Sequence, residues 1–225
     1  MKKIILIIFL NTLLLVACSH NSEKKNIQNQ DNKDKQSATF KKEIKNGRTY
    51  YDDILIVNKT TTLPPDYNPG ENPKAQRALQ RMFADAGEEG VNLYQMSGFR
   101  SYQTQVSLYQ QYVARDGEQA ANRYSARPGT SEHQSGLSYD VGAIGSNCNL
   151  RECFGDTKEG QWIARNAHNY GFIVRYPKGK EQVTGYQYEP WHLRYLGKDT
   201  ATKVAQSGKA LEEYVHYKNA QKANL

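Results

Sequence analysis

The sequence predicts an α+β protein with a small antiparallel sheet flanked by helices. Several stretches carry apolar residues at helical spacing, while other short stretches are rich in β-branched and aromatic residues. The two kinds of stretch do not follow the regular β-α-β order that is typical of parallel sheets. No internal repeat is visible, and 225 residues suffice for one domain plus some non-globular sequence.

The N-terminus has the features of an export signal. Lys2 and Lys3 precede a short apolar run at residues 4–16, which is typical of a signal peptide rather than a membrane span. The sequence that ends at Cys18 is similar to a bacterial lipobox. We therefore expect residues 1–18 to be a lipoprotein signal peptide, with an uncleaved anchor as the alternative. Lipid on Cys18 would hold the protein at the outer face of the bacterial cell membrane.

Residues 19–45 are rich in Asn, Lys and Gln and almost free of large apolar side chains. Such a segment buries too little surface to offset its ordering entropy, so it is predicted to be a flexible tether. The folded domain is placed at residues 46–217, followed by a short tail at 218–225.

The domain itself is divided by recognisable start and stop signals. Asn72 and Pro73 suit an N-cap and first helical turn, and Gly87 suits the helix end. The predicted elements, in order, are a strand within 49–59, a helix from 73 to 87, a strand within 91–99, a helix from 101 to 116, a helix within 159–171, a strand at 172–176, one or two strands within 183–196, and a helical end from 198 with a break near Ser207 and Gly208.

Charge and cysteine content narrow the class of protein. The formal net charge is +7, but no run of basic residues interleaved with aromatics is present, so nucleic-acid binding is not expected. Besides Cys18, only Cys148 and Cys153 remain, and in an oxidising compartment they are expected to form a disulfide. We expect a monomer.

The stretch SEHQSGLSYD at residues 131–140 suggests a metal site. His133 and Asp140 would lie about 10 Å apart on a straight helix and on opposite faces of a straight strand. They can therefore share an ion only if the chain bends between them, and Gly136 permits such a bend. The expected geometry is a histidine on a loop followed by an aspartate on a strand.

A catalytic zinc site usually has a third protein ligand. His192 is the best candidate, because it lies in QYEPWHLRY with Glu189 three residues before it. Pro190 makes a helix interior unfavourable there. On an extended or turning segment, Glu189 can approach the ion without binding it, as a general base does.

Three motifs together resemble the D-alanyl-D-alanine carboxypeptidase family (VanY/LdcB-like zinc peptidases). Residues 131–140 resemble the SxHxxGxxxD motif, residues 189–192 (EPWH) the ExxH motif, and residues 97–101 (SGFRS) the upstream arginine motif. The resemblance extends from about Thr49 to Tyr214. Ser138 departs from the pattern, which has a small apolar residue there, and this difference concerns packing rather than ligands.

The resemblance implies a LAS-type zinc peptidase fold and a set of roles. His133, Asp140 and His192 would bind Zn²⁺, and Glu189 would act as general base. Arg100 would stabilise the oxyanion at the scissile carbonyl. The implied substrate is a peptidoglycan stem peptide that loses its terminal D-alanine, with either D,D- or L,D-specificity.

Candidate substrate-binding residues are Gln105, Ser138 and Trp191, with Trp191 equally suited to a pocket wall or to the core. The alternative function is a non-catalytic module that binds cell wall or a partner on the same fold. A serine D,D-peptidase is excluded, because the sole S-x-x-K sequence, at residues 22–25, lies in the tether.

Overall fold

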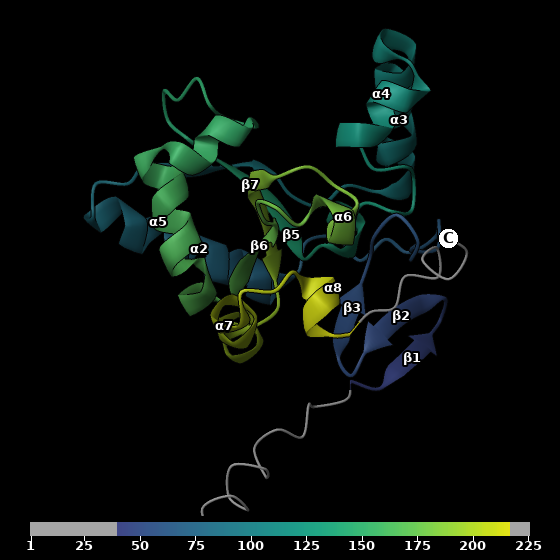
Figure 1. Ribbon diagram of the computed structural model, residues 1–225, viewed down its shortest axis with the longest axis horizontal. Coiled ribbons are helices and arrows are strands. Elements are labelled where there is room, and N and C mark those ends of the chain that lie inside the picture. The colour runs from purple at the N-terminus through teal and green to yellow at the C-terminus, as the bar shows by residue number, and fades with distance from the viewer. Residues whose placement is uncertain (1–39, 217–225) are drawn as a thin grey trace, which may run out of the picture. The chain divides into compact units, whose positions relative to one another are not determined.

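The computed structural model describes residues 40–216, which form two antiparallel sheets with helices around them (Figure 1). The α+β prediction is confirmed. The smaller sheet has the order β1 (Lys42–Lys45), β2 (Arg48–Tyr51), β3 (Ile54–Ile56), and the larger has the order β4 (Leu93–Ser97), β5 (Ser138–Ala143), β7 (Glu189–Tyr195), β6 (Phe172–Tyr176).

Helices make up most of the remaining regular structure. The α-helices are α2 (Pro73–Glu88), α3 (Tyr102–Asp116), α4 (Glu118–Tyr124), α5 (Lys158–Asn166), α6 (Glu181–Thr184), α7 (Lys198–Ser207) and α8 (Leu211–Tyr214), and the 3₁₀ helices are η1 (Glu132–Ser135), η2 (Glu152–Asp156) and η3 (Ala167–Tyr170).

Local sequence explains where the long helices begin. The Asn72 side chain accepts hydrogen bonds from the backbone N–H groups of residues 74 and 75, and Pro73 occupies the first turn of α2. Ser101 caps α3 in the same way through the N–H of residue 104. These polar side chains replace the backbone acceptors that a helix start lacks, as the sequence predicts.

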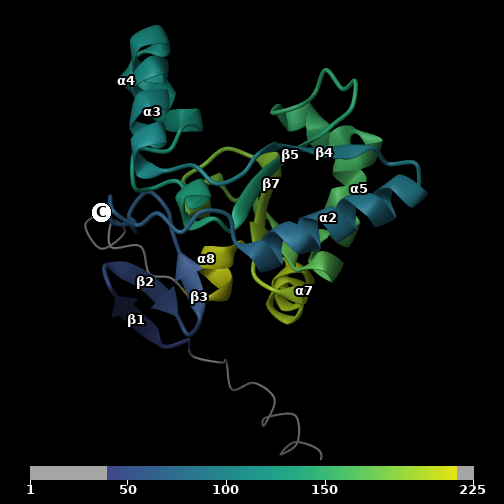
Figure 2. The same ribbon diagram turned by 180° about the vertical axis from the view of Figure 1, so that it is seen from behind.

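One apolar core covers one face of the larger sheet. It joins Leu79 and Met82 of α2 to Val141 of β5, Leu193 of β7 and Trp162 of α5. Both views show α2 and α5 on this side, whereas the α3–α4 hairpin stands on the other side of the sheet (Figures 1 and 2). A second core joins the smaller sheet to β6, α7 and α8.

The structure differs from the sequence-based prediction at four places. The single strand expected within 49–59 is two antiparallel strands, β2 and β3. β1 begins at Lys42, inside the range assigned to the tether, so the folded part starts earlier than residue 46. Its polar sequence, KEIK, gives no burial signal because the strand is held by pairing with β2. Helix α4 was not predicted, and α6 occupies the start of a range predicted as strand.

Other predictions concern residues that lie outside the described range. They are the signal peptide with its lipid on Cys18, the tether up to residue 39, and the tail at 218–225. Within residues 40–216, none of the helices is both long and apolar enough to cross a bilayer.

Cys148 and Cys153 form a disulfide that closes the loop before η2, with their Cα atoms 5.4 Å apart.

Candidate metal centre and active site

Strand pairing places two of the predicted ligands side by side. Asp140 on β5 lies directly opposite His192 on β7 in an antiparallel register. Residues opposite each other in such a pair project to the same face of the sheet with neighbouring Cβ atoms. Asp140 and His192 are therefore neighbours in the fold although they lie far apart in the sequence.

The third ligand reaches the same point through a turn. His133 lies in η1, and Gly136 ends this 3₁₀ helix in the left-handed conformation, with φ of 70°, before β5 begins at Ser138. A side chain at Gly136 would also collide with the carbonyl oxygen of Gly70, since a Cβ atom would lie 2.0 Å from it. The predicted bend between His133 and Asp140 is confirmed.

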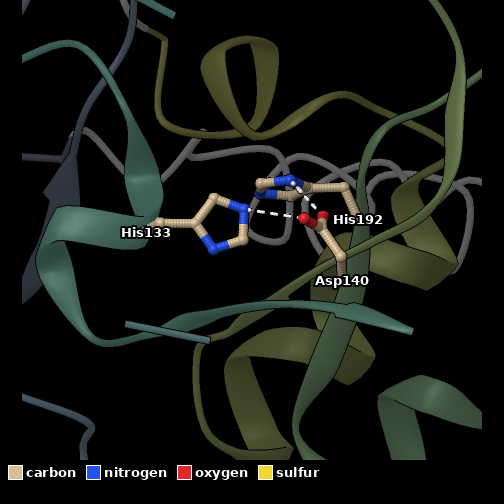
Figure 3. A group of neighbouring side chains, drawn as sticks. All are labelled: His133, Asp140 and His192. Atoms are coloured by element: carbon tan, nitrogen blue, oxygen red, sulfur yellow. Dashed lines mark ion pairs between the residues drawn. The ribbon is translucent and has the colours of Figure 1, made fainter. Parts of the chain in front are cut away.

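The three side chains converge, as Figure 3 shows. His133 Nε2 lies 3.2 Å from Asp140 Oδ2, and His192 Nδ1 lies 3.2 Å from Asp140 Oδ1. One nitrogen or oxygen atom from each residue falls within 4.8 Å of the others. The centroids of the two imidazole rings are 4.9 Å apart, and the rings are nearly perpendicular rather than stacked.

The segment at residues 97–100 supports these ligands. The Ser97 hydroxyl donates to Asp140 Oδ2 at 2.5 Å, and the Gly98 carbonyl lies 2.8 Å from His133 Nδ1. A proton on Nδ1 satisfies that carbonyl and leaves the Nε2 lone pair of His133 directed at Asp140. The motif chosen from sequence for its arginine thus also orients two ligands.

Electrostatics at the site favour a positive charge. Burial opposes charge on His192, but the carboxylates of Asp140 and Glu132 outweigh it and raise its pKa to about 9. Burial likewise opposes charge on Asp140, and the neighbouring His133 and His192 hold its pKa well below the usual range. A cation can replace the proton that the histidine otherwise retains.

A bulge brings Glu189 to the same face as His192. Between the pairs Val174–Leu193 and Tyr176–Glu189, β7 advances by four residues while β6 advances by two. A regular strand would send residues three apart to opposite faces, and the extra residues remove this constraint. Glu189 Oε2 lies 3.7 Å from His192 Nδ1.

Glu189 has the environment of an acid–base group. It is 7% exposed and lines a cavity of about 500 Å³ together with the three ligands and Arg100. Burial raises its pKa to about 8, although His192 opposes this shift. A buried carboxylate with a raised pKa beside open space is characteristic of a catalytic site.

Arg100 lines the same cavity and is held in place by Gln105. Its guanidinium donates to Gln105 Oε1 at 3.0 Å, and its backbone N–H donates to the His133 carbonyl. Gln105 is 1% exposed and uses its Nε2 to donate to the Ala126 carbonyl. Gln105 therefore supports the arginine and does not line the cavity, contrary to the predicted contact with substrate.

The other two candidate substrate residues also have defined places. Ser138 is fully buried and donates a hydrogen bond to Glu132. It therefore does not reach the cavity, contrary to the predicted contact with substrate. Trp191 belongs to the main core and also lines the cavity, which joins the two roles left open by the sequence.

Glu132 is a charged residue of the site that sequence reasoning missed. It is 1% exposed and accepts hydrogen bonds from Arg175 and Arg194 at 2.7 and 2.6 Å. Burial opposes its charge, but the two guanidinium groups hold its pKa well below the usual range. Its place beside His133 was the available signal, because both of its arginine partners lie more than forty residues away.

The donor set fits zinc. Two imidazole nitrogens and a carboxylate oxygen are borderline ligands typical of catalytic Zn²⁺ with an open position. A Ca²⁺ or Mg²⁺ site would instead require mostly oxygen ligands. The cavity beside the three ligands leaves room for water and substrate at that open position.

Comparisons with known proteins agree with this site. Residues 70–198 match the VanY family of D-alanyl-D-alanine carboxypeptidases. The protein YodJ of Bacillus subtilis (strain 168) is 40% identical over 180 residues, which is 72% of this chain and 66% of YodJ. The structure of the LdcB LD-carboxypeptidase superposes with a TM-score of 0.72 and 45% identity, over 81% of this chain and 98% of that one.

A further solved structure is a mutant of the vancomycin resistance D,D-pentapeptidase VanY in complex with Zn(II). It has a TM-score of 0.62 and 33% identity, over 71% of this chain and 97% of that one. The chain belongs to the D-alanyl-D-alanine carboxypeptidase family. It spans slightly less than two thirds of the length of the curated relatives YodJ and the Enterococcus faecalis enzyme.

Proposed function

We propose that this protein is a zinc-dependent carboxypeptidase that removes the terminal D-alanine from peptidoglycan stem peptides. The observation that carries the proposal is the convergence of His133, Asp140 and His192 beside the buried carboxylate of Glu189 in one cavity. A wall-binding module would need neither the general base nor the open metal position. The complete set therefore favours an enzyme over the binding alternative.

Each of the residues at the candidate site has a defined chemical task. A Zn²⁺ ion on the three ligands would polarise the scissile carbonyl and lower the pKa of water. Glu189, which a cation on the three ligands would keep ionised despite its burial, takes a proton from the attacking water, whose oxygen bonds to the carbonyl carbon. Glu189 then passes the proton to the amide nitrogen as the C–N bond breaks and D-alanine leaves. Arg100 donates to the oxygen that carries the negative charge in between.

The tetrapeptide stem is the proposed substrate within this class. Likeness to the LdcB LD-carboxypeptidase is greater, at 45% identity, than to the D,D-pentapeptidase VanY, at 33%. This difference supports cleavage of an L,D-bond. For its location, the lipobox-like sequence at Cys18 supports attachment to the outer face of the cell membrane, where stem peptides occur.

Incubation with synthetic tetrapeptide and pentapeptide stems tests the proposal directly. We expect D-alanine release from the tetrapeptide, loss of release after treatment with a chelator, and recovery when Zn²⁺ is added back. Release from the pentapeptide alone would contradict the L,D assignment. Bound zinc with no release from either peptide would contradict the enzyme and favour the binding module.

Replacing Arg100 by Lys tests the oxyanion role. Lysine keeps the charge but loses the planar fork that Gln105 holds, so we expect kcat to fall by roughly 10²-fold, in the range for loss of one oxyanion donor. Steady-state kinetics on the tetrapeptide measure the change. Arg127→Lys is the control, because Arg127 forms an exposed ion pair with Glu118 outside the catalytic cavity. Equal kinetics for the two variants would remove Arg100 from the mechanism.

A further inference from the structure

Four charged side chains that the proposed chemistry does not use are buried together. Glu132, Arg175, Arg194 and Glu212 are each at most 2% exposed and come from η1, β6, β7 and α8. We refer to these four residues as the buried charge network. Both views place α8 beside β3 (Figures 1 and 2).

The members of the network are joined by short ion pairs. Arg175 bridges the two carboxylates: its Nε donates to Glu132 at 2.7 Å, and its two terminal nitrogens donate to Glu212 at 2.8 and 2.6 Å. Arg194 donates to Glu132 at 2.6 Å and to the carbonyl of Leu55 in β3 at 2.6 Å. Asn58 adds a contact to Glu212 at 3.3 Å. The network therefore ties both chain ends of the domain to η1.

Stability alone is a weak reason for this arrangement. Desolvating four charged groups is costly, and well-packed apolar side chains of similar volume are often as stabilising as a buried ion pair or more so. Two guanidinium and two carboxylate groups also balance in charge, so the network adds no net charge to the core. Its one evident asymmetry is that a single carboxylate, Glu132, faces the candidate metal centre.

On the side of the candidate metal centre, the Glu132 carboxylate faces a ring nitrogen of His192. Glu132 Oε2 lies 3.6 Å from His192 Nε2. Among the described residues, that nitrogen is buried without a hydrogen bond, while Nδ1 of the same ring faces Asp140 at 3.2 Å. A histidine that binds a metal through one nitrogen commonly donates its other N–H to a carboxylate, which fixes both tautomer and ring orientation.

Ser138 strengthens this arrangement. Its hydroxyl donates to the same oxygen of Glu132, Oε2, at 3.1 Å. Ser138 is also the position at which the motif departs from a small apolar residue. The departure therefore adds a hydrogen bond to the carboxylate that faces His192, and its effect is not limited to packing.

We propose that Glu132 is a positioning residue for His192, and that Arg175 and Glu212 hold Glu132 in place from α8. Through the network, a helix outside the matched span 70–198 contributes to the affinity of the metal centre. The inference rests on the proposed zinc site. It goes beyond that site because it assigns a function to residues that are neither metal ligands nor the general base.

Zinc affinity of Glu212→Gln tests the inference at the far end of the network. Glu213→Gln is the matched control, since Glu213 is the adjacent residue and pairs with Lys180 at the surface. Chelator competition on the full chain should show a dissociation constant for Zn²⁺ raised about 10-fold in Glu212→Gln, the lower end of what loss of an outer-shell partner costs. The control should stay within about twofold of the unmodified chain.

Thermal unfolding with and without zinc separates positioning from a purely structural role. A structural role predicts a lower Tm for metal-free Glu212→Gln but an unchanged zinc affinity and zinc-induced rise in Tm, which would overturn the proposal. Positioning predicts a smaller zinc-induced rise. A chain that binds no zinc in unmodified form would instead contradict the proposed function.

Ser138→Ala tests the positioning role of Glu132 if Glu212→Gln does not fold. It removes only the hydrogen bond to Glu132 and leaves all four charges in place. We expect zinc affinity to fall by about threefold, less than for loss of a whole outer-shell partner. Histidine ¹⁵N NMR of the zinc-loaded protein should place the His192 proton on Nε2 in unmodified protein. Unchanged zinc affinity in Ser138→Ala, or a proton on Nδ1, would contradict the role of Glu132.

Discussion

Glu189→Gln should abolish peptide hydrolysis while the protein stays folded and keeps its zinc. Glutamine has nearly the same shape as glutamate but cannot take a proton from water at neutral pH. General acid–base catalysis contributes roughly 10²–10⁴-fold, so the rate of D-alanine release should fall by at least 100-fold. Rates measured on the tetrapeptide stem, with zinc content of the same samples, provide the test.

Retention of zinc is the informative part of this result. Glu189 lies 3.7 Å from His192 Nδ1 and is not one of the three convergent ligands. Glu88→Gln is the control, because it removes the same charge from an exposed position at the end of α2. If Glu189→Gln lost its zinc, the residue would be a ligand rather than the base. If it kept full activity, another group would accept the proton.

Gly136→Ala should produce the largest loss of stability among single substitutions near the site. The backbone there has φ of 70°, and a Cβ atom would lie 2.0 Å from the Gly70 carbonyl oxygen. Left-handed strain costs about 1–3 kcal/mol. Displacing a packed neighbour costs a further ~1–3 kcal/mol. We expect the free energy of unfolding, measured with denaturant, to fall by the sum of the two effects.

Gly145→Ala isolates the contribution of the collision. Gly145 has a similar φ of 77°, but a Cβ atom there would meet nothing within 4 Å. Only the left-handed strain remains, so this variant should lose only the first of the two contributions, about 1–3 kcal/mol. Equal losses at the two glycines would show that the contact with Gly70 does not restrict the turn. Zinc affinity should fall only in Gly136→Ala, because that turn carries His133.

The elements most reliably predicted from sequence are those with their own local signals. Asn72 and Pro73 begin α2 because a capping side chain and a proline act within one turn of the chain. The bend at Gly136 and the strand with Asp140 were also predicted from neighbouring residues, whereas the segment with His133, expected to be a loop, is a 3₁₀ helix. β1 and α4 could not be predicted in this way, because β1 is mostly exposed and α4 has no capping side chain, and each depends on contact with the neighbouring element, β2 or α3.

The candidate site residues also divide into those that the sequence predicts and those that only the fold explains. His133, Asp140, His192, Glu189 and Arg100 could be selected from sequence because residue type, spacing and family motif all converge on them. Gln105 and Ser138 were selected from sequence as substrate-binding candidates near the motifs. Their expected contact with substrate was replaced by contacts with Arg100 and Glu132, which no spacing in the sequence indicates.

By itself, the sequence determined the α+β class, the three candidate metal ligands and the candidate general base beside them. Only the tertiary structure decided which polar groups are buried and which carboxylate each cation meets. Glu132 reaches Arg175, Arg194 and His192 across 43 to 62 residues of chain. Such pairings depend on strand register and on the bulge in β7, which are properties of the folded sheet and not of any local stretch of sequence.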